Sequence, residues 1–345
     1  MKKKMKNKLN AFYNKHYQLS LIFPAVVLIL SLIFIGHNYF SHGDILNRDV
    51  SLTGGTSITF ASNLPVEDVQ KALSSSISDV EVRSLSDNTG IQTHLSVITS
   101  QNLDTIKPIL EKYLGYSLTD QNSTIESTGS SLSKDFYKQL LIAVLIAFFW
   151  MAAVVFIIYA SKRSAKVWAI IINLLLGFFM GSFFFNLPII LSIIILVAIA
   201  GYLIYIYIKH SVPSFAVMLC AFLDVIMTLA VVDLTGMKIS AAGIVAFLML
   251  IGYSVDTDIL LTTRVLKRHG TSVNHEIFGA FKTGMTMTLT ALASVAVALI
   301  FVYSYKTSLN QIFEILLIGL FFDIFNTWIT NTALIKWFVE RDSFK

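Results

Sequence analysis

Charged residues are scarce in this chain of 345 residues. Only 14% of its residues are Asp, Glu, Lys or Arg, against about 25% in soluble domains, while 55% are hydrophobic. The mean hydropathy is +0.71. This composition excludes a soluble globular protein and predicts a polytopic membrane protein.

Cysteine is almost absent, since Cys220 is the single one and lies in an apolar run. A lone cysteine excludes an internal disulfide framework and a thiolate metal site, so we predict a packing role for it and expect neither metal nor cofactor. The net charge of +5 is not accompanied by an array of basic and aromatic residues, so we expect no nucleic acid partner.

Eight apolar runs are long enough to cross a hydrocarbon core about 30 Å thick at about 1.5 Å per residue. Their approximate bounds are 19–39, 138–160, 166–186, 188–208, 213–233, 239–263, 284–304 and 311–337. The first run lacks a signal-peptide cleavage site and is predicted to be retained as a helix. With both ends, 1–18 and 339–345, in the cytoplasm, most Lys and Arg residues obey the positive-inside rule. We predict a multi-pass protein of the cell membrane in that orientation.

One polar segment, residues 41–137, is long enough to form a domain, and it lies on the extracytoplasmic side in this topology. Its pattern predicts, in order, a strand at 50–60, a helix at 66–75, strands at 80–85 and 91–98, a helix at 103–113 and a strand near 117–127. This order suits a small ferredoxin-like α+β domain. The segment has no clustered carboxylates and no nucleophile beside a base, so we expect it to bind or move rather than catalyse, and the chain is not predicted to be an enzyme.

Aspartates inside the apolar runs are the candidates for function. Asp224 lies near the middle of its run, and Asp256 and Asp258 lie near the inner end of the next. An ionisable side chain there costs about 2.5 kcal/mol or more and usually faces a bundle interior or a wet cavity. Because Asp256 and Asp258 are two residues apart, about 200° around a helix, only one of them can point squarely into a given pathway.

Lys282 opens the following run and precedes Thr283, Thr286 and Thr290, which fall on one helical face. A cation with a ladder of hydroxyl groups suits a partly hydrated seam. We therefore treat a proton relay as a hypothesis, in which Asp256 and Lys282 alternate between protonated and paired states. The candidate relay residues are Asp256, Asp258, Asp224 and Lys282.

Structural roles are the alternative for each candidate. Threonines in membrane helices often bond their own backbone or join neighbouring helices, and a lysine at a helix end can extend to the interface. Asp258 could be held in a static ion pair. In the last run, Asp323 and Asn326 are predicted to make a helix–helix contact rather than to carry protons.

Several motifs resemble the SecD/SecF family. The segment DVSLTGGTSITF at 49–60 resembles the element that follows the first span of these proteins, with Asp49, Gly54, Gly55 and Thr56 in the matching positions. Three further segments are similar to archaeal-type SecF: IGYSVDTDILLTTRVLKR at 251–268, KTGMTMTLTALASV at 282–295 and FDIFNTWITN at 322–331. SecF is the smaller subunit of the SecDF protein-export complex, a relative of the RND transporters.

The resemblance implies a SecF-like subunit that assists preprotein export and is driven by proton flow. It implies a SecD-like subunit, a SecY-type translocon, unfolded preprotein and the lipid bilayer as partners. Asp256 falls where SecD-type sequences carry an intramembrane Asp, whereas the bacterial SecF Asp falls on Thr257, and Lys282 stands where bacterial SecF has Arg. The family normally has six spans, so residues 165–210 would form an extra hairpin in a seven-helix bundle at 138–338.

Two other functions stay open from the sequence. The chain could be an RND-like exporter of lipids or small molecules, although one domain of this size is small for a substrate cavity. It could also be a non-conducting structural subunit of the translocon, with static aspartate pairs. An intramembrane protease is disfavoured because the paired YD and GxGD signatures are missing.

Overall fold

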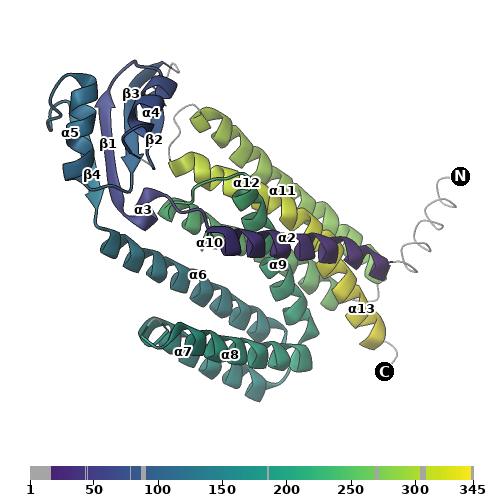
Figure 1. Cartoon of the computed structure of the whole chain (residues 1–345). Coiled ribbons are helices and arrows are strands. Elements are labelled where there is room, and N and C mark those ends of the chain that lie inside the picture. The colour runs from purple at the N-terminus through teal and green to yellow at the C-terminus, as the bar shows by residue number, and fades with distance from the viewer. Residues whose placement is uncertain are drawn as a thin grey trace, which may run out of the picture.

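The computed structural model describes residues 17–42, 44, 46–77, 79–86, 91–184, 186–268, 272–303 and 308–342. Residues 1–16 and 343–345 of the predicted cytoplasmic ends lie outside this description. A small α/β domain sits at one end of a helical bundle, and the last helix, α13, ends far from that domain (Figure 1). Eight described helical segments are long and apolar enough to cross a membrane, which confirms the predicted class of fold.

Apolar runs without interior breaks form the bundle. Its helices are α2 (Ile22–His42), α6 (Ser130–Tyr159), α7 (Arg163–Ser182), α8 (Ile189–His210), α9 (Val212–Leu234), α10 (Ala241–Leu266), α11 (Val273–Val302), α12 (Ser308–Phe325) and α13 (Thr332–Asp342). A short 3-10 helix, Tyr17–Leu21, precedes α2, and a π-helical segment, Asn326–Asn331, joins α12 to α13. Helices α9, α10 and α12 pack together in the centre, whereas the hairpin α7–α8 lies against α6 at the side (Figure 1).

The α/β domain has the element order expected for a ferredoxin-like fold. Its elements are β1 (Gly55–Ala61), α4 (Val66–Ser74), β2 (Glu81–Ser86), β3 (Gln92–Thr99), α5 (Leu103–Leu114) and β4 (Ser123–Thr128). The strands lie in the order β2-β3-β1-β4, and all neighbours are antiparallel. Alternate strand residues such as Ile58, Phe60, Leu95 and Val97 form the core with residues of both helices. Polar residues occupy the other face.

The first predicted strand, 50–60, is only partly correct. Its beginning is a short helix, α3 (Val50–Thr53), in which the amides of Leu52 and Thr53 donate to the Asp49 carbonyl at 2.9 and 3.0 Å. Leu52 is fully buried against the bundle. Helical turns favour this placement because an extended chain would direct alternate residues away from the bundle.

The two glycines of the motif turn the chain from α3 into β1. Gly54 and Gly55 have φ values of +83° and +142°, a region that side chains rarely adopt. A Cβ atom on Gly55 would lie 2.2 Å from the carbonyl oxygen of Thr99 in β3. The glycine pair therefore permits both the turn and the close approach of two strands, while Thr56 is buried and donates to the Gln101 carbonyl at 2.9 Å.

Candidate functional site in the membrane bundle

Three aspartates occupy the centre of the bundle. Asp224 on α9, Asp258 on α10 and Asp323 on α12 are 0%, 0% and 1% exposed. No Lys or Arg within the described ranges forms an ion pair with any of them. A carboxylate buried without a cation is costly in an apolar bundle, so these groups depend on hydrogen bonds or on bound protons.

Asp224 has hydrogen bonds to both of its carboxyl oxygens. Oδ2 accepts from the Ser254 hydroxyl on α10 at 2.5 Å, and Oδ1 accepts from the Asn326 amide at 2.6 Å. Asp224 thus joins α9 to α10 and to the π-helical segment. This arrangement alone is consistent with a structural role.

Asp258 and Asp323 each have one oxygen with a partner and one without. Asp258 Oδ1 accepts from the Asn331 amide at 2.7 Å, and Asp323 Oδ1 accepts from the Thr327 hydroxyl at 3.0 Å. Within the described part of the chain, both Oδ2 atoms are buried and have no hydrogen-bond partner. Each such atom loses the hydrogen bonds that water would give it, which costs about 1–3 kcal/mol.

The π-helical segment Asn326–Asn331 supplies most of the polar partners. Its Asn326, Thr327, Thr330 and Asn331 side chains are all buried, because the wider turn brings several successive polar residues to the inner face. Single π-turns inside α-helices occur often at functional sites. The sequence does show a polar stripe here, since Asp323, Thr327 and Asn331 are spaced by four residues and thus share a helical face.

The structure places Asp256 away from this cluster. Asp256 is exposed, whereas Asp258 is buried, as their separation around the helix requires. Asp256 lines an open cavity of about 750 Å³ near the end of α10 that is remote from the α/β domain, together with Arg264, Lys267 and Glu276.

Lys282 is also exposed, and its Nζ atom lies 5.0 Å from the centre of the Phe278 ring. The hypothesis of an Asp256–Lys282 pair has to be corrected for this structure, in which the described residues form no such ion pair. The cation that reaches across from α10 to α11 is instead Arg264, which contacts Glu276 at 3.3 Å.

The threonine ladder lies on the outer face of α11. The hydroxyls of Thr283, Thr286 and Thr290 donate to backbone carbonyls four residues earlier at 3.3, 2.8 and 2.7 Å. All three side chains are exposed, so they do not line the buried cluster. Thr288 is buried instead and interacts with Asp323. Its four-residue spacing from two small residues, Ala280 and Gly284, is the sequence signal for this inner face.

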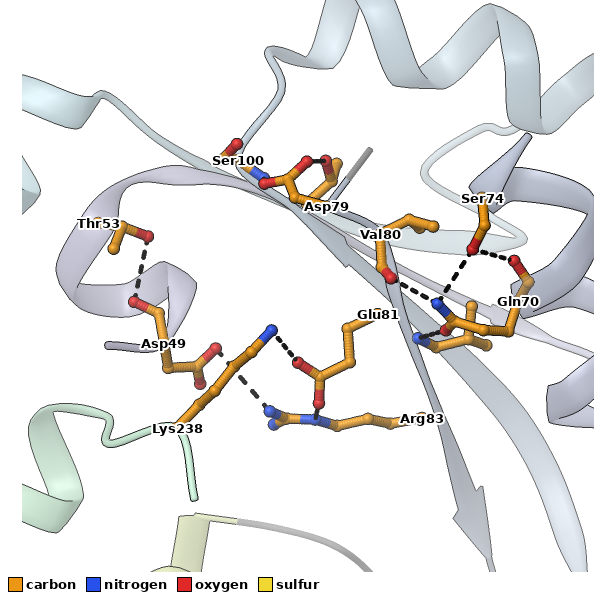
Figure 2. Close-up of polar contacts among 12 residues, drawn as sticks. Asp49, Thr53, Gln70, Ser74, Asp79, Val80, Glu81, Arg83, Ser100 and Lys238 are labelled. Atoms are coloured by element: carbon orange, nitrogen blue, oxygen red, sulfur yellow. Dashed lines mark hydrogen bonds and ion pairs between the residues drawn. The ribbon is translucent and has the colours of Figure 1, made fainter. Parts of the chain in front are cut away.

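A second group of charges lies where the α/β domain meets the bundle (Figure 2). Glu81 on β2 contacts Lys238, from the loop between α9 and α10, at 2.9 Å and Arg83 at 2.8 Å. Arg83 also lies 3.9 Å from the motif residue Asp49. Burial would raise the pKa of Glu81, but its hydrogen bonds to Lys238 and Arg83 outweigh burial and hold this pKa below its usual value.

Backbone hydrogen bonds reinforce the same junction. The amide of Asp49 donates to the carbonyl of Ile239 at 2.9 Å, and the amide of Ile239 donates to the carbonyl of Asn47 at 2.6 Å. The predicted motif residue Asp49 therefore serves in this structure to attach the start of the α/β domain to the α9–α10 loop.

The fold and the buried polar centre define a class, namely helical membrane proteins with an RND/SecDF-like bundle and a small ferredoxin-like domain. The family of the C-terminal part of the protein export membrane proteins SecD and SecF matches residues 180–341. The protein-export membrane protein SecF of Methanocaldococcus jannaschii is 31% identical, over 95% of this chain and 97% of that protein. SecF of Methanolacinia petrolearia is also 31% identical, over 92% of each chain.

This chain therefore belongs to the SecF family of protein-export membrane proteins. The crystal structure of SecDF from Thermus thermophilus, a translocon-associated membrane protein, has a similar fold, with a TM-score of 0.57 at 17% identity. The likeness covers 94% of this chain but only 38% of the SecDF chain.

Proposed function

We propose that this chain is the SecF-type subunit of a SecDF-like complex, which assists the export of preproteins through the Sec translocon and uses the transmembrane proton gradient. The names of the SecF relatives support the role in export. The observation that supports the proton coupling is the group of three buried aspartates without a cation, two of which keep an unpartnered carboxyl oxygen.

The proposed partners are a SecD-like subunit, a SecY-type channel and an unfolded preprotein within the lipid bilayer. Polar side chains on the surface of a membrane helix are expensive in contact with lipid. Asp256, Lys282 and the threonine ladder are exposed in the isolated chain, on α10 and α11. A homologous SecD-like bundle packed against these two helices would remove this polar face from lipid, which supports the assignment of that partner.

In the proposed orientation the α/β domain lies outside the cell and both termini lie in the cytoplasm. The domain and the end of α13 lie at opposite ends of the bundle, which supports this orientation (Figure 1). The protein would act by movement rather than as an enzyme. One proton that crosses 100 mV supplies about 2.3 kcal/mol, enough to bias a two-state movement of the domain.

Reconstituted export tests this function. Proteoliposomes that contain the chain, its SecD-like partner and the SecY-type channel are compared with and without an imposed proton gradient. We expect the gradient to accelerate export, and Asp258→Asn to remove the acceleration while leaving export without a gradient unchanged. Export that does not respond to the gradient in the wild-type complex contradicts the proposed coupling.

The same assay assigns the outward-facing candidate. If Asp256→Asn removes the acceleration and Asp258→Asn does not, the coupling stands but its proton carrier faces the partner subunit.

A non-conducting structural subunit is the second candidate function. Both oxygens of Asp224 are hydrogen-bonded, and the ladder threonines bond their own helix, as such a role requires. In that case Asp224→Asn and Asp258→Asn would lower the yield of the assembled complex without changing its response to the gradient. An RND-like exporter of lipids or small molecules would instead move a substrate in vesicles that lack the SecY-type channel.

A further inference from the structure

A hydroxyl group lies between each successive pair of the buried aspartates. Ser254 donates to Asp224 at 2.5 Å and also interacts with Asp323. Thr327 donates to Asp323 at 3.0 Å and also interacts with Asp258. The five side chains thus form one continuous series of carboxyl and hydroxyl groups, with Asp323 at its centre.

Regular helical spacing builds this series. Ser254 and Asp258 are four residues apart on α10, and Asp323 and Thr327 are four residues apart at the end of α12, so each pair occupies one helical face. All five side chains are at most 1% exposed. The packing of α9, α10 and α12 therefore excludes lipid from the whole series.

The unpartnered oxygens are hard to explain by helix packing alone. A side chain that serves only to join helices would use its hydrogen-bonding atoms, yet Asp323 Oδ2 and Asp258 Oδ2 are buried and have no partner among the described residues. A metal ion does not explain them either, because the described residues contain no group of three His, Cys, Asp or Glu that could hold one. A carboxyl oxygen with no fixed donor is, however, free to bind or release a proton.

We propose that Asp323 is the central proton carrier of a relay that runs from Asp258 through Thr327, Asp323 and Ser254 to Asp224. This inference rests on the proposed coupling to the proton gradient, and it identifies the carrier within that function. It replaces the helix–helix contact predicted for Asp323.

Each transfer uses a hydroxyl group that ends unchanged. The O–H bond of protonated Asp258 breaks as its proton binds the Thr327 oxygen, and Thr327 gives its own proton to the Asp323 carboxylate. Asp258 becomes a carboxylate, Asp323 becomes a carboxylic acid, and Thr327 remains a neutral alcohol. Ser254 carries out the same exchange between Asp323 and Asp224. No reactant other than the proton is required.

Further buried hydroxyls extend both ends of the series. Thr228 is one helical turn beyond Asp224 toward the α/β domain, is fully buried, and has a hydroxyl oxygen without a partner among the described residues. Thr262 is one turn beyond Asp258 in the opposite direction and lies 3.4 Å from the Asn331 amide. Ser254 to Thr262 alone extends about 12 Å along α10, a large part of a core about 30 Å thick.

Substitutions at Asp323 and Thr327 test the relay in the reconstituted export assay. We expect Asp323→Asn and Thr327→Val to reduce the acceleration by the gradient at least tenfold, with export in the absence of a gradient unchanged. Asp323→Glu and Thr327→Ser, which keep the carboxyl and hydroxyl groups, should retain part of it. Ser192→Ala removes a buried hydroxyl of α8 outside the relay and should have no effect on the acceleration.

A spectroscopic measurement separates proton binding from a structural role. In infrared difference spectra of the purified wild-type chain, we expect carboxylic acid bands that change with pH, and Asp323→Asn should remove one of them. A purely structural aspartate would leave these pH-dependent bands unchanged. If Asp323→Asn does not fold, the Thr327→Val and Thr327→Ser pair decides.

The outcomes distinguish this inference from the function on which it rests. If the wild-type complex responds to the gradient and Asp323→Asn or Thr327→Val responds equally, the relay is wrong and the proposed coupling stands. If the wild-type complex does not respond at all, both are wrong. Loss of the response together with loss of the pH-dependent infrared band supports the relay.

Discussion

The carboxylates at the domain junction and those in the membrane centre have opposite surroundings. Glu81 is partly exposed and lies beside two cations, at 2.9 Å from Lys238 and 2.8 Å from Arg83. Asp323 is 1% exposed and has only a hydroxyl within hydrogen-bond distance, at 3.0 Å. A cation stabilises the ionised form and thereby fixes the charge, whereas a hydroxyl can serve both forms. The first arrangement suits attachment, and the second suits proton exchange.

A single loop connects these two regions. Lys238 of the α9–α10 loop contacts Glu81 of the domain, while its carbonyl accepts from the Gln311 amide of α12 at 2.5 Å. The Gln311 side-chain oxygen also accepts from the amide and hydroxyl of Ser240, at 2.9 and 2.6 Å. Since α10 begins at the next residue, the loop joins the domain directly to the two helices that carry Asp258 and Asp323.

The largest expected effect separates the domain from the bundle without changing the buried aspartates. Gly55→Ala should destabilise the start of β1 by about 3 kcal/mol or more, because the new Cβ would meet the Thr99 carbonyl in a strained backbone region. Hydrogen exchange of β1 amides in the full chain measures this. Gly129→Ala is the control, since its Cβ would meet no atom within 4 Å. Equal protection in the two variants would contradict the close approach.

A smaller effect tests whether neutral donors do the stabilising work in the membrane centre. Asn326→Ala removes the donor at 2.6 Å from Asp224 and leaves a buried carboxyl oxygen unpaired. We expect thermal unfolding in detergent to show a loss of about 2 kcal/mol. Asn186→Ala is the control, because Asn186 is exposed and donates only to the Ser182 carbonyl of its own chain turn. An unchanged unfolding temperature in Asn326→Ala would mean that Asp224 does not depend on this donor.

A double-mutant cycle at the junction should give a smaller value. Glu81→Gln and Lys238→Met, singly and together, should show a coupling of about 0.5–1 kcal/mol, because both side chains are partly exposed to solvent. The coupling should weaken at high salt, since exposed charges are screened. Hydrogen exchange of β2 in the four proteins provides the measurement. A coupling that ignores salt would show that the pair is shielded from solvent.

The pH dependence of the same pair follows from the lowered pKa of Glu81. Because its folded-state pKa lies below the model value of 4.5, the ion pair stabilises the junction above that pH. The contribution is lost as the pH falls through the lowered folded-state value. Exchange of β2 amides should therefore rise on acidification more in the wild type than in Glu81→Gln. An identical pH profile in both proteins would remove Glu81 as the cause.

Local patterns in the sequence were sufficient to predict the class of fold. Long apolar runs and alternating strands depend on near neighbours, so the eight spans and the order of elements in the α/β domain could be predicted. The helix α3 could not, because it depends on the burial of Leu52 against a distant bundle.

The candidate site was harder to predict because its contacts join residues far apart in the sequence. The depth of Asp224 and Asp258 in their spans identified them as candidates. The contact of Asn326 with Asp224 joins positions 102 residues apart and depends on the π-helical segment. Nothing in a single sequence distinguishes that segment from a regular α-helix. The Asp256–Lys282 pair failed for a related reason, since the side on which each residue emerges is set by the packing of whole helices.

The smallest expected effect compares two threonines with the same local bonding. Thr290 on α11 and Thr327 both donate to a group four residues earlier, but Thr290 is exposed and bonds a backbone carbonyl, whereas Thr327 is buried and bonds Asp323. Thr290→Val in the isolated chain should change the free energy of unfolding by less than about 0.5 kcal/mol, because the carbonyl keeps its helical partner. Thr327→Val should cost more, since it leaves a second oxygen of Asp323 unpaired. Thermal unfolding of the two purified variants measures the difference. Equal stabilities would mean that the buried hydroxyl contributes no more than the exposed one, and the contrast between the inner and outer faces of the bundle would then rest on proton transfer alone.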